Sequence, residues 1–142
     1  MSFHVEDIPG CDELYKAVPR KKIQDDDYPE PGVFVKNGTG VSTSWSKYST
    51  ALACRTLRSR PEAHGVYALP VQGVRDLAMG VSHTPKDWCQ AHADIVEVDR
   101  DPEYHVKLAR MAAASGMRLR PNPPKLSASE EKRAQKASYK KT

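Results

Sequence analysis

The sequence predicts an α+β fold with a small mixed or antiparallel sheet, two to three helices and a basic, disordered C-terminal tail. Several short segments alternate apolar with polar residues, as strands do, and other segments have the apolar spacing of a helix. These segments follow one another in an irregular order, which favours a partly antiparallel sheet over a doubly wound parallel one. The length of 142 residues suits one domain with its own core.

The first predicted element is a strand over residues 12–18, because its side chains alternate between two faces. Leu14, Lys16 and Val18 share one of these faces. Residues 20–32 are predicted to form a loop, since they contain a run of aspartates and two prolines that oppose regular structure.

A hairpin and a helix are predicted next. Residues 33–35 and 41–45 form the two strands of the hairpin, joined by a turn at an Asn-Gly dipeptide that tolerates positive φ. The helix covers residues 51–59, with Ser49 or Thr50 as its N-cap and a proline just beyond its end.

The middle of the chain is predicted to contain three strands and a short helix. Residues 65–70 have the apolar character of an interior strand, and residues 71–79 form a short helix that ends at a glycine. Two further strands cover residues 81–83 and 91–98, with a loop between them. Alternation along the second of these strands places every other side chain on the same face.

The clearest helix is predicted over residues 102–115. Asp101 is the N-cap, Pro102 stands at the first helical position, and Gly116 ends the helix. Several apolar side chains recur at helical spacing between these signals, so this helix is expected to pack one side against the core.

The chain divides into a globular domain at residues 1–120 and a tail at residues 121–142. Charges balance in the domain, so the whole net charge of +4 falls in the tail, which has almost no apolar content and is predicted to be disordered. Basic tail residues can contact the phosphates of nucleic acid non-specifically. The tail residues expected to do so are Lys132, Arg133, Lys136, Lys140 and Lys141.

The composition indicates a cytoplasmic protein without membrane contact. The three cysteines, Cys11, Cys54 and Cys89, are odd in number and widely spaced, which argues against a disulfide framework and against a structural zinc site. The N-terminal residues lack the basic and apolar regions of a signal peptide, and no apolar run is long enough to span a membrane.

The segment 81–94 is the best candidate for a site, because it gathers two histidines, a cysteine, a tryptophan and two aspartates on a strand, a loop and a strand. We expect His83, His92 and Asp94 to share a face and to carry any catalysis, with Asp94 as a general base oriented by His92. The alternative is that both histidines only hydrogen-bond the intervening loop to the sheet. His83, Cys89 and His92 are also residue types that bind zinc or iron, although they follow no recognised metal spacing.

A Ser-Thr-Ser sequence at residues 42–44 resembles the central motif of one class of ADP-ribosyltransferases. That resemblance implies an NAD site, preceded by a strand that bears arginine and followed by a strand that bears glutamate. Here the first strand offers Lys16, unless Arg20 serves instead, and Glu97 lacks the expected Glu-x-Glu context. The alternative is a hairpin strand with alternating hydroxyls, followed by a helix cap.

The chain also resembles a group of small bacterial proteins that have no assigned function. The resemblance covers about residues 41–94, and it brings no activity with it. It makes a bacterial or phage-related origin plausible. The segments that carry it are residues 45–50, 65–69, 74–75, 81–85 and 91–92.

Three functions follow from these patterns. The first is a binding or adaptor domain for a protein or nucleic acid, in a bacterial defence or regulatory system, with the tail contacting nucleic acid. The second is a small enzyme that uses a nucleotide or NAD, with His83, His92 and Asp94 as catalytic groups. The third is a metal-binding domain. In the second case the ligand-binding residues are Ser42, Ser44 and Tyr48, and the sequence does not say which cofactor is used.

Overall fold

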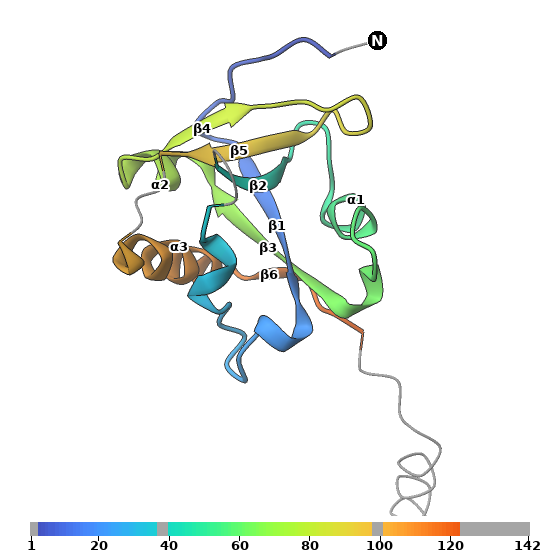
Figure 1. The fold of residues 1–142 in the computed structure, drawn as a ribbon, viewed down its shortest axis with the longest axis vertical. Helices are drawn as coiled ribbons and strands as arrows, with labels where there is room; N and C mark the ends of the chain where they lie inside the picture. The colour runs from blue at the N-terminus through green and yellow to red at the C-terminus, as the bar shows by residue number, and fades with distance from the viewer. Residues whose placement is uncertain (1–2, 37–39, 98–100, 123–142) are drawn as a thin grey trace, which may run out of the picture.

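The computed structural model describes residues 3–36, 40–97 and 101–122, and within them it shows a six-stranded antiparallel sheet with three helices (Figure 1). The predicted α+β class is therefore confirmed. In space the strands follow the order β4-β5-β2-β1-β3-β6, so the first strand of the chain lies inside the sheet. The strands are β1 (Glu13–Pro19), β2 (Gly40–Trp45), β3 (His64–Pro70), β4 (Gly80–His83), β5 (His92–Val96) and β6 (Met117–Leu119).

The helices cover both faces of the sheet. α1 (Ala51–Thr56) packs on β1 and β3 on one face, while α2 (Val71–Asp76) and α3 (Pro102–Ser115) cover the other face (Figure 1). None of the helices in the described part of the chain has the length and apolar character needed to cross a membrane. In the described ranges, short 3₁₀ turns lie at Arg20–Lys22, Pro31–Phe34 and Pro61–Ala63.

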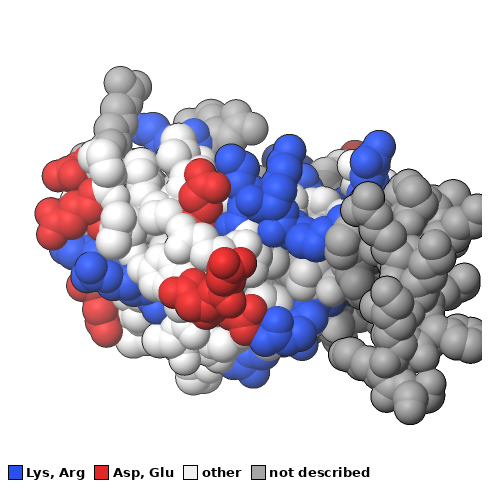
Figure 2. Space-filling view, turned by 90° about the horizontal axis from the view of Figure 1, so that it is seen from below, with Lys and Arg blue, Asp and Glu red and all other residues white. Residues whose placement is uncertain are grey.

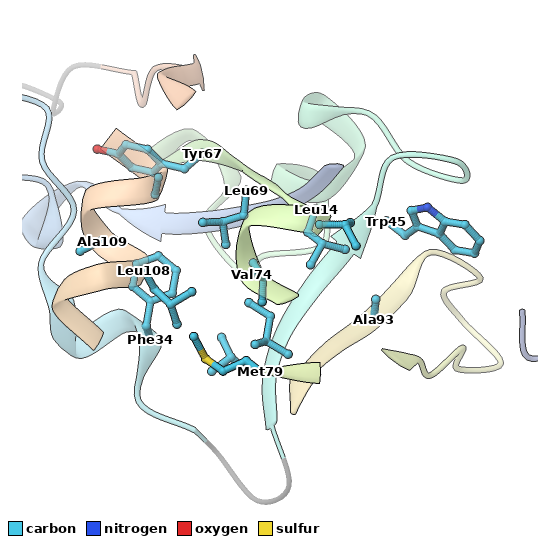
Figure 3. Close-up of a cluster of buried hydrophobic side chains, with 14 of the residues drawn as sticks. Leu14, Phe34, Trp45, Tyr67, Leu69, Val74, Met79, Ala93, Leu108 and Ala109 are labelled. Atoms are coloured by element: carbon cyan, nitrogen blue, oxygen red, sulfur yellow. The ribbon is translucent and has the colours of Figure 1, made fainter. Parts of the chain in front are cut away.

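The core lies between the sheet and the pair α2 and α3 (Figure 3). Leu14 of β1 stands opposite Leu69 of β3, and both side chains are fully buried. Phe34 and Leu108 close the core from the helical side. Because α1 covers the other face of β3, this strand is buried on both faces, which agrees with its prediction as an interior strand.

Side-chain caps begin two of the helices where the sequence predicts them. Asp101 accepts a hydrogen bond from the Glu103 amide at 3.0 Å, and Gly116 ends α3 with a φ of 85° that favours glycine. Thr50, and not Ser49, is the N-cap of α1, because its Oγ1 accepts from the Ala53 amide at 3.1 Å. Side-chain capping therefore determines the residues at which α1 and α3 begin.

The predicted hairpin at residues 33–45 is wrong. Pro31–Phe34 forms a 3₁₀ turn that begins at its proline, and it places Phe34 in the core instead of in a strand. The strand at residues 41–45 is correct, but as β2 it pairs with β1 and β5. Residues 37–39, where the turn was predicted, lie outside the described residues.

Other boundaries differ by a few residues. α1 and α2 end at Thr56 and Asp76, about one turn before their predicted ends, and α2 is followed by Ala78 with a positive φ of 62°. That backbone turn redirects the chain into β4. The sequence analysis missed the short edge strand β6, whose three residues pair with β3 beside a shift in register.

Candidate functional site between β1 and β2

The register of β2 and β5 decides which of the predicted site residues lie together. Asp94 stands opposite Ser42, and His92 stands opposite Ser44, so these four side chains share one face of the sheet. His83 lies on the opposite face, because it pairs with the residue between His92 and Asp94. The expectation that His83, His92 and Asp94 share a face is therefore correct for His92 and Asp94 and wrong for His83.

His83 belongs to a separate cluster that ties the N-terminal segment to the sheet. Its Nδ1 accepts a hydrogen bond from the Glu6 amide at 3.0 Å, so its Nε2 carries the proton and donates to the Gln90 carbonyl at 2.7 Å. The Tyr48 hydroxyl donates to the Glu6 carboxylate, and the Tyr48 ring stacks on His83 at 6.1 Å. His83 and Tyr48 therefore act as structural groups here, away from the face that holds Ser42.

A pocket opens on the face that holds Ser42 and His92, where β1 and β2 separate. The two strands are paired only at Leu14 with Trp45 and at Tyr15 with Ser44, so a gap forms beyond these pairs. Its cavity volume is about 140 Å³. The polar residues that line it are Tyr15, Lys16, Ser42, Thr43, Ser44, Arg58 and His92.

Lys16 fills part of the gap and is the unusual residue of the pocket. Its Nζ donates to the Ser42 carbonyl oxygen at 3.2 Å. Burial lowers the pKa of the Lys16 ammonium, and the positive charge of Arg58 lowers it further. Two positive charges thus meet in a pocket whose lining contains no carboxylate. An anion in this pocket would relieve their repulsion.

His92 is held in one tautomer by the loop after β4. Its Nδ1 lies 3.0 Å from the Thr84 carbonyl oxygen, which can only accept, so Nδ1 carries the proton of the neutral ring. Thr84 Oγ1 lies 2.9 Å from the same nitrogen and donates to Asp94 Oδ2 at 3.1 Å. Asp94 therefore orients Thr84, which in turn holds the His92 ring. Because Nδ1 carries the proton, Nε2 is the ring nitrogen that can accept one.

Trp88 and Cys54 line the pocket together with the apolar side chains of Ala17 and Leu57. The Trp88 side chain is 68% exposed, and its ring meets the His92 ring edge to face at a centroid distance of 6.2 Å. An exposed indole beside a cationic pocket offers a surface on which a base can stack. The Cys54 thiol is buried, which raises its pKa, so it is protonated and a poor nucleophile at neutral pH.

The described residues contain no group of three His, Cys, Asp or Glu side chains that could hold a metal ion. His83 and His92 lie on opposite faces of the sheet, so they cannot join Cys89 around one ion. The three cysteines are free thiols.

Comparison of the chain with family models, with curated proteins and with solved structures gives no match. The resemblances to ADP-ribosyltransferases and to small bacterial proteins therefore stay predictions. Lys16 and residues 42–44 do line one pocket, but Glu97 is not part of its lining. An acid in the position that the ADP-ribosyltransferase pattern requires is thus missing from this pocket.

The sequence analysis considered Lys16 only as a substitute for the arginine of the ADP-ribosyltransferase pattern and did not expect it as a cation of this pocket. A lysine between Leu14 and Val18 on an inward strand face is itself a signal of a special environment. Arg58 gives no such signal, since it follows α1 in a segment rich in arginine. The tail residues predicted to contact nucleic acid lie outside the described residues. They are Lys132, Arg133, Lys136, Lys140 and Lys141.

Proposed function

We propose that the pocket between β1 and β2 binds the phosphate of a nucleotide. The observation that carries this proposal is that two cations, Lys16 and Arg58, line one pocket that contains no carboxylate. The hydroxyls of Ser42 and Ser44 belong to the same lining. Lysine is a compact charge for a phosphate oxygen, and arginine offers a planar set of donors. The same arrangement would repel a cationic ligand.

The size of the pocket and its aromatic border favour a nucleotide over a free anion. A cavity of about 140 Å³ is smaller than a site that encloses a whole drug-sized ligand. It suits a phosphate group, while the rest of the ligand lies outside. The exposed ring of Trp88 borders the pocket beside His92, and a base can stack there.

His92 gives the site a group for acid–base chemistry, which extends the proposal to a small enzyme. With Nδ1 held by Thr84, Nε2 can accept a proton from a water molecule or from a sugar hydroxyl of the bound ligand. His92 is the catalytic residue in this proposal. Thr84 and Asp94 are positioning residues, because they act on the ligand only through His92.

Calorimetric titration with ADP and with inorganic phosphate tests the proposal. The wild-type protein should bind ADP more tightly than phosphate, and Arg58→Gln should weaken both. Arg110→Gln is the matched control, because Arg110 is an exposed arginine on α3 and does not line the pocket. Absence of saturable ADP binding, or equal affinity in wild type and Arg58→Gln, would refute it.

The adaptor function and the contact of nucleic acid through the tail stay predictions. The adaptor function rests on the lack of a complete catalytic motif in the sequence, and the nucleic-acid contact rests on tail residues that lie outside the described residues. Deletion of this tail separates them from the pocket, since ADP binding by the pocket should survive the deletion.

A further inference from the structure

A second hollow lies on the same side of β1 as the phosphate pocket, at the end of the strand. Its cavity volume is about 410 Å³, which is larger than that of the first pocket. It is formed where the chain leaves β1 and where the segment after α1 leads into β3. The polar side chains that line it are Arg20, Lys21, Ser59, Arg60 and His64.

The two hollows are lined by consecutive parts of the same two segments. On one segment Lys16 belongs to the first pocket and Arg20 to the second, and on the other Arg58 belongs to the first and Arg60 to the second. At the rise of an extended strand, Lys16 and Arg20 are about 13 Å apart along the chain. One phosphate group cannot contact both ends of such a surface, whereas a chain of phosphates can.

Most cations of this surface lack a carboxylate partner among the described residues, as does the neighbouring Arg55, which donates to the backbone carbonyl of Arg120. Among the described residues, Lys21, Arg58 and Arg60 have no ion pair, and Arg20 donates only to the backbone carbonyl of Asn122. Three neighbouring cations are already paired. These pairs are Lys22 with Glu30, Arg118 with Glu13 and Arg120 with Asp27.

Figure 2 views this end of the molecule from below and shows Lys and Arg side chains gathered into a basic area, bordered by separate groups of acidic side chains. Glu62, which is exposed beside the second hollow, offsets one of these charges. The remaining positive charge is complementary to a polyanion. It comes from the folded part of the chain, whose overall charge is balanced, and not from the tail.

We infer that the two hollows together bind one single-stranded nucleic acid. The inference rests on the proposed phosphate site and extends its ligand from a nucleotide to a strand. The backbone runs along the cations from Arg20 and Arg60 to Lys16 and Arg58, and a base stacks on Trp88 at the end of the path. A single strand fits better than a duplex, because paired bases are not free to stack on an exposed indole.

Fluorescence anisotropy with a labelled 12-nucleotide strand tests the inference on the full chain. Oligo-U and oligo-dU, which differ only in the sugar, are used in separate arms, because the contacts described here are to phosphate and base. Tight, salt-dependent binding of either strand supports the inference, and a difference between them identifies the preferred sugar. The affinity should fall steeply as salt is added, since each phosphate contact releases counterions.

A triple variant, Arg20→Gln with Lys21→Gln and Arg60→Gln, isolates the second hollow. Its affinity for the strand should fall about tenfold or more and its salt dependence should weaken, because it has lost three cationic contacts. Its affinity for ADP should not change, since none of the three residues lines the first pocket. Lys107→Gln on α3 is the matched control and should bind the strand as the wild type does.

Trp88→Ala should also weaken strand binding, by about fivefold or more, but without changing its salt dependence. Three results would overturn the inference: a duplex that binds as tightly as the strand, a triple variant that retains full affinity, or an Arg58→Gln variant that does so. Retained affinity in the triple variant would show that the second hollow does not bind the strand. If the wild-type protein binds no ADP but the triple variant binds the strand more weakly, the proposed phosphate site is refuted and strand binding stays with the second hollow.

Discussion

Replacing Lys16 with methionine removes the ammonium from the phosphate pocket while keeping a side chain of similar length in the gap between β1 and β2. The substitution therefore separates the charge of Lys16 from its packing. It also removes the hydrogen bond to the Ser42 carbonyl oxygen, but Ser42 is exposed, so water can replace that donor. Arg58 stays as the second cation of the pocket.

The expected loss of affinity follows from the contact that is removed. A hydrogen bond to a charged group contributes about 1.5–3 kcal/mol. Because about 1.4 kcal/mol corresponds to a factor of ten, Lys16→Met should weaken ADP binding about 10- to 100-fold. Calorimetric titration at neutral pH measures this directly, and Trp88 fluorescence gives a second readout from the border of the pocket.

The same substitution should stabilise the fold at neutral pH. Burial and the neighbouring Arg58 lower the pKa of Lys16, so the folded state disfavours its charged form. Below the lowered pKa the group is protonated in both folded and unfolded chains, and this cost is fully present. As pH rises through the lowered pKa, the folded protein releases the proton first. The cost disappears once pH exceeds the ordinary lysine value near 10.5.

Urea unfolding at pH 7 and at pH 10 measures this difference. Lys16→Met should have the larger free energy of unfolding at pH 7, and the wild type should approach it at the higher pH. Lys21→Met serves as the control, because Lys21 is exposed beyond the end of β1. A less stable Lys16→Met protein at pH 7, or one with unchanged ADP affinity, would refute this account of the pocket.

Three further predictions test the fold. Leu69→Ala should lower the free energy of unfolding by about 2–5 kcal/mol, because removal of the fully buried side chain leaves a cavity. A loss below about 1 kcal/mol, measured by urea unfolding, would contradict this. Thr50→Ala should cost about 1 kcal/mol, since the Ala53 amide loses its cap, and Thr50→Ser should restore most of it. Burial raises the pKa of Tyr67 to about 12, and the nearby Asp27 charge adds to this, so the Tyr67 contribution to stability is present below pH 10 and is lost between pH 10 and 12. Tyr67→Phe should remove that part of the alkaline loss of stability, and an unchanged pH profile would contradict the assignment.

The parts of the fold that sequence predicts well are those set by local chemistry. Asp101, Pro102 and Gly116 bracket α3 with capping signals that act within one turn. The alternation along β5 is equally local, and it places His92 and Asp94 on one face as expected. Such signals need no knowledge of the partner strands or helices.

The errors arise where distant contacts override a local pattern. Val-Phe-Val resembles a strand, but Pro31–Phe34 forms a 3₁₀ turn that packs against α3 and buries Phe34. For the site, alternation along single strands could not show that β4 pairs with β5 in the register that sends His83 to the opposite face. Arg58 enters the pocket only because α1 packs across β1. No local pattern in the sequence carries that information.

The place of β1 in the sheet has a consequence for folding kinetics. β1 is made first, yet both of its partners, β2 and β3, follow it in the chain, and the pairing of β2 with β5 joins residues that are 50 positions apart, as in the contact of Thr43 with Ala93. Loops of this length must close before the pairings stabilise anything, so folding should be slow for a chain of this size, in the range of milliseconds to seconds. Until β2 arrives both edges of β1 are unpaired, and one edge stays unpaired until β3 follows, so the nascent chain is most prone to wrong strand pairing during that interval.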